Sequence, residues 1–305
     1  MAPKRVKAYI YLLLAALIWG IAGPVIKFTL DGIDPLPFIS YRLAISAVIS
    51  IIFFILKIKK GKKFRQLRVH LPLVFLYGFL AVPAALGLLF AGLDNTTILD
   101  LTLISVIGPI IVAVGGAAFF SEHITKRERI GVSIVLLGVL LNSLYPIIKA
   151  EGVKLTANIL LFAYLLADSG SILIAKKLSR FKINSANLTN LAFIIGAITL
   201  LPLTLVSYGW ENFFSQIVNL PLKYHLGVWY MAIFSGSIAY YLFVRAHKSI
   251  EVSEAVLFNY LQPVITIPLA IFWLHESISP SFITGAILIT IGLIIAEYKK
   301  KRYNT

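Results

Sequence analysis

Residues 107–138 read IGPIIVAVGGAAFFSEHITKRERIGVSIVLLG, and residues 261–292 read LQPVITIPLAIFWLHESISPSFITGAILITIG. A constant offset of 154 residues aligns one proline, one glutamate and two glycines in these stretches. The aligned pairs are Pro109 with Pro263, Glu122 with Glu276, Gly131 with Gly285, and Gly138 with Gly292. A fixed period of this kind is typical of a duplicated unit. The sequence therefore predicts two units, residues 1–148 and residues 149–305.

The composition indicates that these units fold in lipid. Of the 305 residues, 59% are hydrophobic and 13% are charged, and the mean hydropathy is +0.90. Apolar runs of about 18 to 25 residues recur, and a helix of that length crosses ~30 Å of hydrocarbon. The ten predicted spans are roughly 8–29, 36–57, 71–92, 97–120, 129–148, 157–176, 186–207, 226–246, 253–274 and 280–297. We therefore expect an all-α integral membrane protein with ten transmembrane helices.

Basic residues indicate how the spans are oriented. Of the 28 lysines and arginines, 23 lie on alternate connections, at residues 1–7, 57–70, 121–129, 176–182, 245–251 and 299–302. Cytoplasmic loops are enriched in these residues, so we expect both termini to be cytoplasmic and the protein to be multi-pass in the plasma (inner) membrane. Because the net charge of +15 is confined to alternate loops, we expect no nucleic-acid partner. The first span is too long for a signal peptide and is expected to be retained.

An odd number of spans in each unit has a geometric consequence. Five crossings place the second unit upside down relative to the first. Inverted repeats around a shared site are typical of secondary transporters that work by alternating access. Glu122 then lies at the cytoplasmic end of span 4, and Glu276 at the external end of span 9. Each precedes the next span, where a carboxylate favours a helix N-terminus, so we expect both to be structural caps.

The second repeat carries the pattern of a known family. Its residues are Trp229, then Leu257-Phe258-Asn259-Tyr260-Leu261-Gln262-Pro263, Trp273-Leu274-His275-Glu276, Gly285 and Gly292. This pattern resembles the second repeat of the EamA-type family in the drug/metabolite transporter superfamily. Residues 89–141 resemble the first repeat, and Trp19-Gly20 and Arg42 fit its opening spans. The resemblance implies ten helices, with spans 5 and 10 as a peripheral scaffold and a central cavity lined by the other eight. It also implies transport, with export as the favoured direction.

Asp168 is the clearest candidate for function. It lies about eleven residues into span 6, near the predicted midplane. Ionisable residues in hydrocarbon are costly and usually face a cavity or a partner. Asp168 could accept a substrate ammonium group or act as a protonatable coupling site, which makes protons a candidate coupling ion. The alternative is a structural acid that is bonded to neighbouring hydroxyls or is neutral.

Lys27, Arg42 and Asp100 form a predicted gating group, because all three fall in the external third of their spans. Arg42 could clamp a carboxylate bidentately. The structural alternative is an Arg42–Asp100 pair that closes the external side, with Lys27 extending toward water. The repeat also relates Asp100 to Glu254, near the cytoplasmic start of span 9, so Glu254 is a gating candidate as well.

Spans 4 and 9 have equivalent polar positions. Ser105 and Asn259 each precede a proline by four residues, and Gln262 follows on the same side of span 9. We expect these side chains to orient a polar substrate, although bonding between helices would satisfy the amides equally well. Pro109 and Pro263 are candidate hinges because proline frees a carbonyl in its helix. Static kinks are the alternative.

Aromatic residues complete the candidate site. Trp19 and Tyr164 lie at mid-span on the equivalent helices 1 and 6, so we expect them to contact the apolar part of a substrate. Further candidates to line an amphipathic cavity are Tyr77, Tyr230, Tyr240, Tyr241 and Tyr260. Any of these aromatics could instead be a packing or interfacial residue.

The predicted function is transport rather than catalysis. The sequence lacks the serine hydrolase, zinc protease, P-loop and dinucleotide motifs, and it has no cysteine, so we expect no enzyme activity, cofactor or metal. We expect a small-molecule substrate, an amino acid or related amine, moved across the lipid bilayer by a monomer or weak homodimer. The alternatives are a lipophilic-cation exporter, a sugar-phosphate or nucleotide-sugar exchanger, and a protein that handles lipids.

Overall fold

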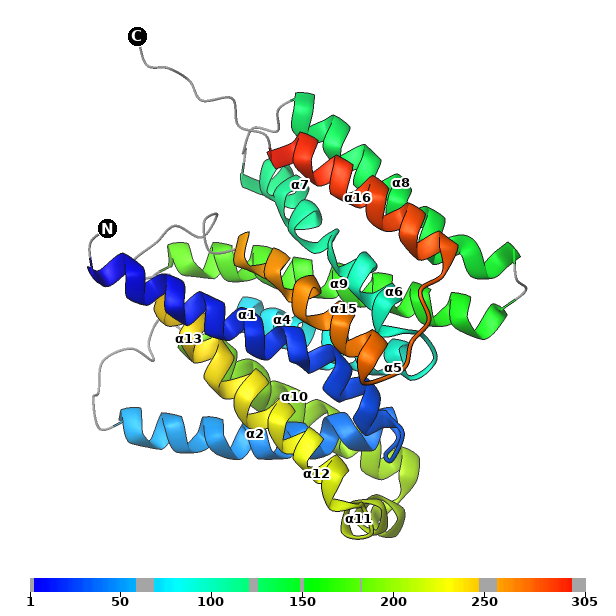
Figure 1. The fold of residues 1–305 in the computed structure, drawn as a ribbon. Coiled ribbons are helices and arrows are strands. Elements are labelled where there is room, and N and C mark those ends of the chain that lie inside the picture. Colours follow the sequence, from blue (N-terminus) through cyan, green and yellow to red (C-terminus); the bar gives the residue numbers. More distant parts are fainter. Residues whose placement is uncertain are drawn as a thin grey trace.

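The computed structural model describes residues 3–58, 69–120, 126–148, 151–181, 183–246 and 257–297, and it is helical throughout these ranges apart from short turns and connections (Figure 1). Seven helical segments are long and apolar enough to cross a membrane. Three shorter apolar helices, Arg129–Tyr145, Phe258–Phe272 and Pro280–Ile295, lie where spans 5, 9 and 10 are predicted. The protein is therefore an integral membrane protein with multiple apolar helices.

The helices follow the order of the predicted spans. In the first unit they are α1 (Pro3–Leu30), α2 (Pro35–Ile58), α4 (Leu71–Phe79), η1 (Leu80–Ala84), α5 (Ala85–Asp94), α6 (Ile98–Ser105), α7 (Gly108–Phe120) and α8 (Lys126–Ile148). In the second unit they are α9 (Gly152–Arg180), α10 (Ser185–Tyr208), α11 (Trp210–Val218), α12 (Leu222–Trp229), η2 (Tyr230–Ala239), α13 (Tyr240–Ala246), η3 (Leu257–Leu261), α15 (Gln262–Phe272) and α16 (Pro280–Glu297).

Equivalent spans depart from α-helical geometry at equivalent places. Span 3 contains the π-helical segment η1, and span 8 contains the longer π-helical segment η2. Span 4 is interrupted between α6 and α7, and span 9 passes from the 3-10 helix η3 into α15. Pro109 and Pro263 lie in the first turn of α7 and α15, where a missing N–H leaves no bond unmade. Both prolines therefore begin a new helical segment.

Pro24 illustrates how a proline inside a span is accommodated. Its missing N–H would otherwise bond the carbonyl of Gly20, one turn earlier in α1. The hydroxyl of Thr266 on α15 donates to this carbonyl at 2.7 Å. Gly20 allows the close approach, because an added Cβ would lie 2.9 Å from Cβ of Ile265. A helix of the second unit thus satisfies the carbonyl freed in the first.

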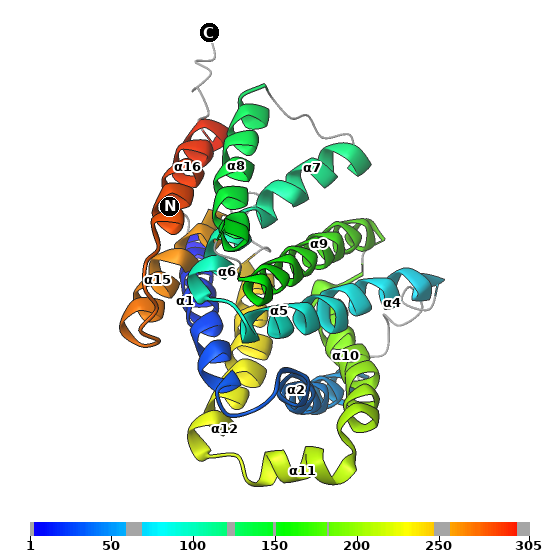
Figure 2. The same cartoon turned by 90° about the vertical axis from the view of Figure 1, so that its right-hand side faces the viewer.

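Helices α8 and α16 pack side by side at one edge of the molecule through glycines (Figure 1, Figure 2). An added Cβ on Gly138 would lie 2.8 Å from the carbonyl oxygen of Gly285, and one on Gly292 would lie 2.7 Å from that of Gly131. Exchanging each glycine for its repeat equivalent converts the first contact into the second. These helices are the predicted spans 5 and 10.

The other contacts between helices follow the same exchange. Helix α1 packs on α15, and its counterpart α9 packs on α7. Likewise α9 packs on α5 while α1 packs on η2 and α13, and α2 packs on η2 while α10 packs on α4. These contacts therefore form pairs that are related by exchanging residues 1–148 with residues 149–305.

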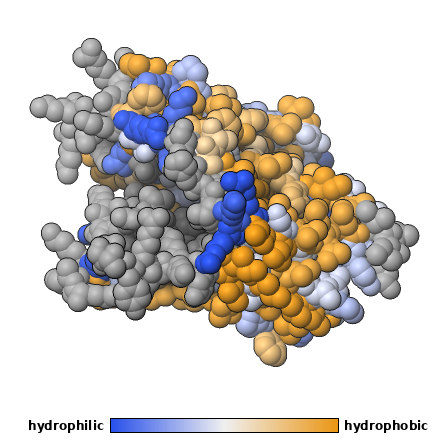
Figure 3. Space-filling view, turned by 90° about the horizontal axis from the view of Figure 1, so that it is seen from above, coloured by the Kyte–Doolittle hydropathy of each residue, from blue (hydrophilic) through white to orange (hydrophobic). Residues whose placement is uncertain are grey.

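The outer surface suits a lipid environment. Apolar side chains such as Leu17, Ile55 and Val206 are 45%, 57% and 85% exposed. In Figure 3, apolar side chains cover much of the right-hand side of the view, and hydrophilic ones gather in the middle and at the upper left. Helix α11 lies across one end of the bundle, between α10 and α12 (Figure 2). Its Phe213 is buried and its Trp210 is exposed, in keeping with the interface-like composition of this connection.

Candidate functional site

Asp168 on α9 lies among tyrosines from three helices. It interacts electrostatically with Tyr77 on α4, with Tyr164 on its own helix and with Tyr240 on α13. The hydroxyl of Tyr77 is hydrogen-bonded to Thr189 on α10. Within the described part of the chain, the carboxylate of Asp168 makes no hydrogen bond or ion pair. Only its backbone carbonyl is used, as the acceptor for the hydroxyl of Ser171. The carboxylate is thus free to accept hydrogen bonds from a ligand.

Trp19 joins this group through Tyr240. The two rings meet edge to face with centroids 5.2 Å apart, and Tyr240 also packs against Phe193 on α10. The indole N–H of Trp19 donates to the carbonyl of Ser235 in η2 at 3.1 Å. Three residues singled out from sequence, Trp19, Tyr164 and Asp168, therefore come together around Tyr240. We call these four residues and Tyr77 the Asp168 cluster.

The side chains of the Asp168 cluster are packed but not fully buried. Tyr240 is 36% exposed, and its ring contacts Trp19 of α1 and Phe193 of α10. Asp168, Tyr164 and Trp19 are half-buried as well. The arrangement can hold an amphipathic solute, with one acceptor for a cation and aromatic faces for its apolar part.

Arg42 on α2 lies near the same cluster, within electrostatic reach of Tyr240. Its side chain is 3% exposed, its Nε donates to the carbonyl of Met231 at 3.1 Å, and its guanidinium carbon lies 5.8 Å from the ring centroid of Phe90. Its Nη1 is buried without a hydrogen-bond partner. The residue joins α2 and α5 of the first unit to η2 of the second.

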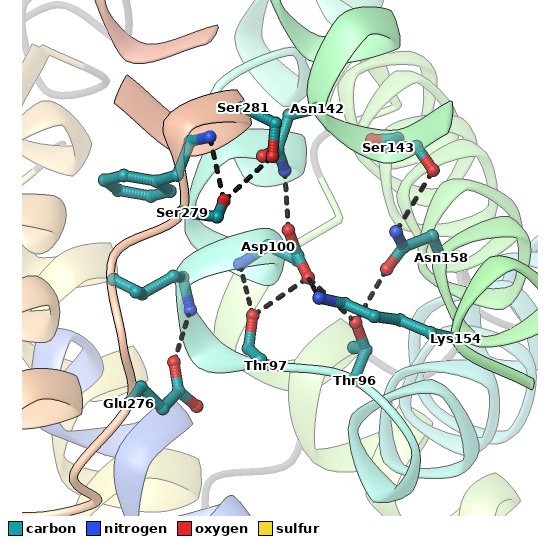
Figure 4. Close-up of polar contacts among 12 residues, drawn as sticks. Thr96, Thr97, Asp100, Asn142, Ser143, Lys154, Asn158, Glu276, Ser279 and Ser281 are labelled. Atoms are coloured by element: carbon teal, nitrogen blue, oxygen red, sulfur yellow. Dashed lines mark hydrogen bonds and ion pairs between the residues drawn. The ribbon is translucent and has the colours of Figure 1, made fainter. Parts of the chain in front are cut away.

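Asp100 lies in a different network near the start of α6, and both oxygens of its carboxylate are bonded there (Figure 4). Its Oδ1 accepts from Asn142 at 2.6 Å, and its Oδ2 lies 2.9 Å from the hydroxyl of Thr97 and 3.2 Å from Nζ of Lys154. The predicted Arg42–Asp100 pair is therefore wrong. Counting depth along a span placed both residues in the external third, but it could not show that their side chains point to different neighbours.

The same network continues toward α9. The hydroxyl of Thr96 lies 3.2 Å from Oδ2 of Asp100 and 2.7 Å from Oδ1 of Asn158. The amide of Asn158 then donates to the carbonyl of Ser143 on α8 at 3.2 Å. The network thus joins α6, α8 and α9, and it satisfies the carboxylate of Asp100 with partners from both units.

Two charged side chains cap the helix ends beside this network. Nζ of Lys27 donates to the carbonyls of Leu93 and Asp94 at 2.8 and 3.0 Å, at the C-terminus of α5. The carboxylate of Glu276 accepts from the amides of Ile98 and Leu99 at 2.7 and 3.0 Å, at the N-terminus of α6. Both charges complement the helix dipole. Lys27 is therefore bound to the protein rather than extended toward water.

Glu276 is a structural cap, as predicted, but the helix that it caps is α6 and not the span that follows it in sequence. His275 has a positive φ of 56°, which turns the chain immediately before this glutamate. Burial raises the pKa of Glu276, whereas the two backbone amides and Lys27 act in the opposite direction. Glu122, the repeat equivalent, lies outside the described residues, and so does Glu254.

The polar positions of spans 4 and 9 remain candidates. The amide nitrogen of Gln262 donates to Oδ1 of Asn259 at 3.2 Å, so these two side chains bond each other. Ser105 ends α6 and is half-buried. The structure does not place these three in contact with the Asp168 cluster. Among the described residues, no group of three or more His, Cys, Asp or Glu could hold a metal ion.

Comparison with known proteins gives a consistent result. The model of the EamA-like transporter family matches the chain twice, over residues 6–144 and 155–298. The uncharacterized transporter YyaM of Bacillus subtilis is 25% identical, over 99% of this chain and 98% of its own length. An uncharacterized transporter of Archaeoglobus fulgidus is 26% identical, over 96% of this chain and 100% of its own length.

A solved crystal structure resembles the whole molecule. It aligns with a TM-score of 0.62 and 16% sequence identity, covering 98% of this chain and 99% of that chain. Likeness at this level of identity concerns the fold alone.

Proposed function

The chain belongs to the EamA-like transporter family and is a membrane transporter, and we propose that it exports an amino acid or related amine by alternating access. The observation that carries this proposal is the unpaired carboxylate of Asp168. Burying a carboxylate without partners inside a helical bundle costs free energy, and an ion pair with a substrate ammonium group would offset that cost. Trp19, Tyr164 and Tyr240 would contact the apolar part of the substrate.

The exchange symmetry of the helix contacts supports two inverted five-helix repeats, residues 1–148 and 149–305. Each gate would then be the counterpart of the other, with cytoplasmic termini and a site between the units in the plasma membrane. Lys27 and Glu276 hold the two helix ends that flank Asn95 to Thr97, and the Asp100 network holds α6 to its neighbours. We propose that these contacts keep the external side closed and must open during transport.

Replacement of Asp168 by asparagine tests the site. The amide preserves the shape of the side chain and removes its charge, so we expect uptake of amino acids and amines into proteoliposomes to fall by about 10-fold or more, the worth of a hydrogen bond to a charged group. The pH dependence of transport should change as well, because protons are a candidate coupling ion. Unchanged transport with an unchanged pH profile would contradict the assignment.

Glu211→Gln is the matched control. It removes a carboxylate from the exposed start of α11, and it should leave transport as it is in the wild type. The unfolding temperatures of both variants in detergent show whether a loss of transport comes from the binding site or from a destabilised fold. Because the carboxylate of Asp168 has no bond to lose, Asp168→Asn should unfold at or above the wild-type temperature.

Export of lipophilic cations is the second candidate, favoured by the rings that surround Trp19. Tyr240 and Phe243 meet this indole edge to face at 5.2 and 5.1 Å. Aromatic faces beside an acid suit quaternary ammonium ions. Competition by such ions against amino acid uptake would favour this function, whereas stereoselective uptake of one amino acid enantiomer would exclude it.

A further inference from the structure

Helix α11 has three different faces around its axis. At about 100° per residue, Trp210, Phe214 and Val218 fall within a sector of about 80°. These side chains are 64%, 41% and 77% exposed, and we call them the apolar stripe. The adjoining sector is polar and exposed, and it consists of Glu211, Asn212, Ser215 and, just beyond the helix, Asn219. The exposed surface of α11 is therefore divided lengthwise into an apolar part and a polar part.

The third face of α11, opposite the apolar stripe, is held by the protein. Phe213 is buried, and Nε2 of Gln216 donates to Oδ2 of Asp34, in the turn between α1 and α2, at 3.0 Å. Gln216 is two residues from both Phe214 and Val218, which is about 200° around the helix. Helix α11 also packs on α2 and α10. The apolar stripe therefore points away from the bundle.

The connections of α11 place it at the edge of the hydrocarbon. Helix α10 has 24 residues, so it is about 36 Å long, enough to cross ~30 Å of hydrocarbon. Gly209, which joins α10 to α11, has a positive φ of 78°, and Pro221 precedes α12. The chain thus turns after one span, runs across the end of the bundle as α11, and turns again into the next span (Figure 2).

The apolar stripe continues the lipid-facing surface of the two spans beside it. Leu203 and Val206 of α10 are exposed, and so are Leu222 and Leu226 of α12. Because these side chains lie on membrane-spanning helices, the surface on both sides of the stripe contacts lipid. Glu211 is the one charged residue in the sequence of α11. Attraction of basic residues to anionic lipids therefore cannot hold this helix at the membrane, whereas burial of apolar area can.

We propose that α11 is an interfacial helix whose apolar stripe lies among the lipids of the external leaflet, held by apolar contact rather than by charge. Trp210 suits this depth, because its indole has an apolar body and one polar N–H. Through Gln216 and Asp34, the lipid contact anchors the turn between α1 and α2. A stable dimer buries about 800 Å² on each partner, more than three side chains of a nine-residue helix offer, so a second copy fits the stripe less well.

Single cysteines test the two exposed faces, because the sequence has no cysteine of its own. Phe214→Cys and Val218→Cys report on the stripe, and Asn212→Cys and Ser215→Cys are matched controls on the polar face. Each carries a nitroxide label in vesicles of phosphatidylcholine. The ratio of collisions with oxygen, which enters hydrocarbon, to collisions with a water-soluble nickel chelate should be several-fold higher on the stripe. Adding phosphatidylglycerol should leave this ratio unchanged, since α11 has no basic residue.

Trp210→Phe supplies a measurement that needs no label and keeps the apolar stripe intact. Brominated phosphatidylcholine should quench the fluorescence of the wild type by a larger fraction than that of the variant, because Trp210 would lie in contact with lipid. Equal quenching, or high nickel accessibility at all four labelled positions, would place α11 in water and overturn the proposal. Low accessibility of the stripe to both reagents, with a dimeric elution volume in size-exclusion chromatography, would assign the stripe to a second copy and overturn it as well.

Discussion

Two aspartates in neighbouring parts of the bundle differ in what surrounds them. Asp100 is held by Thr97, Asn142 and Lys154, whereas the carboxylate of Asp168 has no partner among the described residues. A fully bonded acid is stabilised by its surroundings and has little capacity left for a ligand. Residue type is the same at both positions, so the bonding partners that surround each carboxylate distinguish the aspartate that can bind substrate from the one that cannot.

The pH dependence of stability should reveal the cap at Glu276. Burial raises its pKa, with Asp100 acting in the same direction and Lys27 and the backbone amides acting against it. The folded protein then holds this proton more tightly than the unfolded chain does. Its contribution to the free energy of unfolding is therefore greatest at acidic pH and falls as the pH rises through the raised pKa.

Thermal unfolding of wild type and Glu276→Gln between about pH 4 and pH 8 measures this contribution, because glutamine does not titrate. The unfolding temperature of the wild type relative to the variant should fall as the pH rises. Glutamine at position 276 can accept only one of the two backbone hydrogen bonds that Glu276 accepts. This loss lowers the unfolding temperature of the variant by the same amount at every pH, so it does not change how the difference depends on pH. A constant difference across the range would show that Glu276 titrates alike in the folded and unfolded states.

At the level of single residues, sequence could select candidates but could not group them. Depth counting selected Trp19, Tyr164 and Asp168, and the structure gathers all three around Tyr240. The same counting failed for Arg42, because the direction of a side chain depends on helix rotation. The carbonyl of Met231 that anchors Arg42 belongs to the backbone of a π-helical segment, and no residue type signals that in advance.

At the level of elements, long apolar runs predicted the helices well, and the repeat predicted where they deviate. Pro109 and Pro263 are predicted as hinges of spans 4 and 9, with static kinks as the alternative, and in the structure both lie in the first turn of a new helical segment. The π-helical segments η1 and η2 had no sequence signal. They widen equivalent spans, and π-helical turns occur frequently at functional sites. Carbonyl groups of η2 accept hydrogen bonds from the side chains of both Trp19 and Arg42.

The packing of α8 on α16 should depend on its glycines. In Gly292→Ala, the new Cβ would lie 2.7 Å from the carbonyl oxygen of Gly131 and 2.8 Å from the amide nitrogen of Val135, so the helices must separate. Overpacking of this kind costs about 1–3 kcal/mol, and the unfolding temperature in detergent should fall.

Gly152→Ala is the matched control for this substitution. No heavy atom lies within 4 Å of the Cβ that it adds at the start of α9, so its unfolding temperature should match or slightly exceed that of the wild type. Equal unfolding temperatures for the two variants would mean that α8 and α16 can adjust to the added methyl group.

For the whole molecule, the contact pattern limits how the units can move. Several contacts between residues 1–148 and residues 149–305 have a counterpart obtained by exchange, such as α1 with α15 and α9 with α7. A rearrangement that opens one set of contacts can therefore form the exchanged set without new chemistry. Asp168 lacks a charged counterpart, because the matched positions in α1 hold Ile18 and Trp19. The scaffold is thus nearly symmetric while the proposed binding groups are not, as a site that holds one polar solute in a defined orientation requires.

The orientation of the whole chain can be tested directly because the sequence has no cysteine. Ser215 on α11 and Ser179 near the end of α9 are both exposed, and each can be replaced by a single cysteine. Of the 28 basic residues, 23 lie on the side of Ser179, so that side should be cytoplasmic. A membrane-impermeant maleimide should label Ser215→Cys in intact cells and Ser179→Cys only after permeabilisation. The reverse labelling would show that the bundle has the opposite orientation in the membrane. The Asp100 network and the caps at Lys27 and Glu276 would then lie on the cytoplasmic side. The proposal that these contacts close the external side would be wrong.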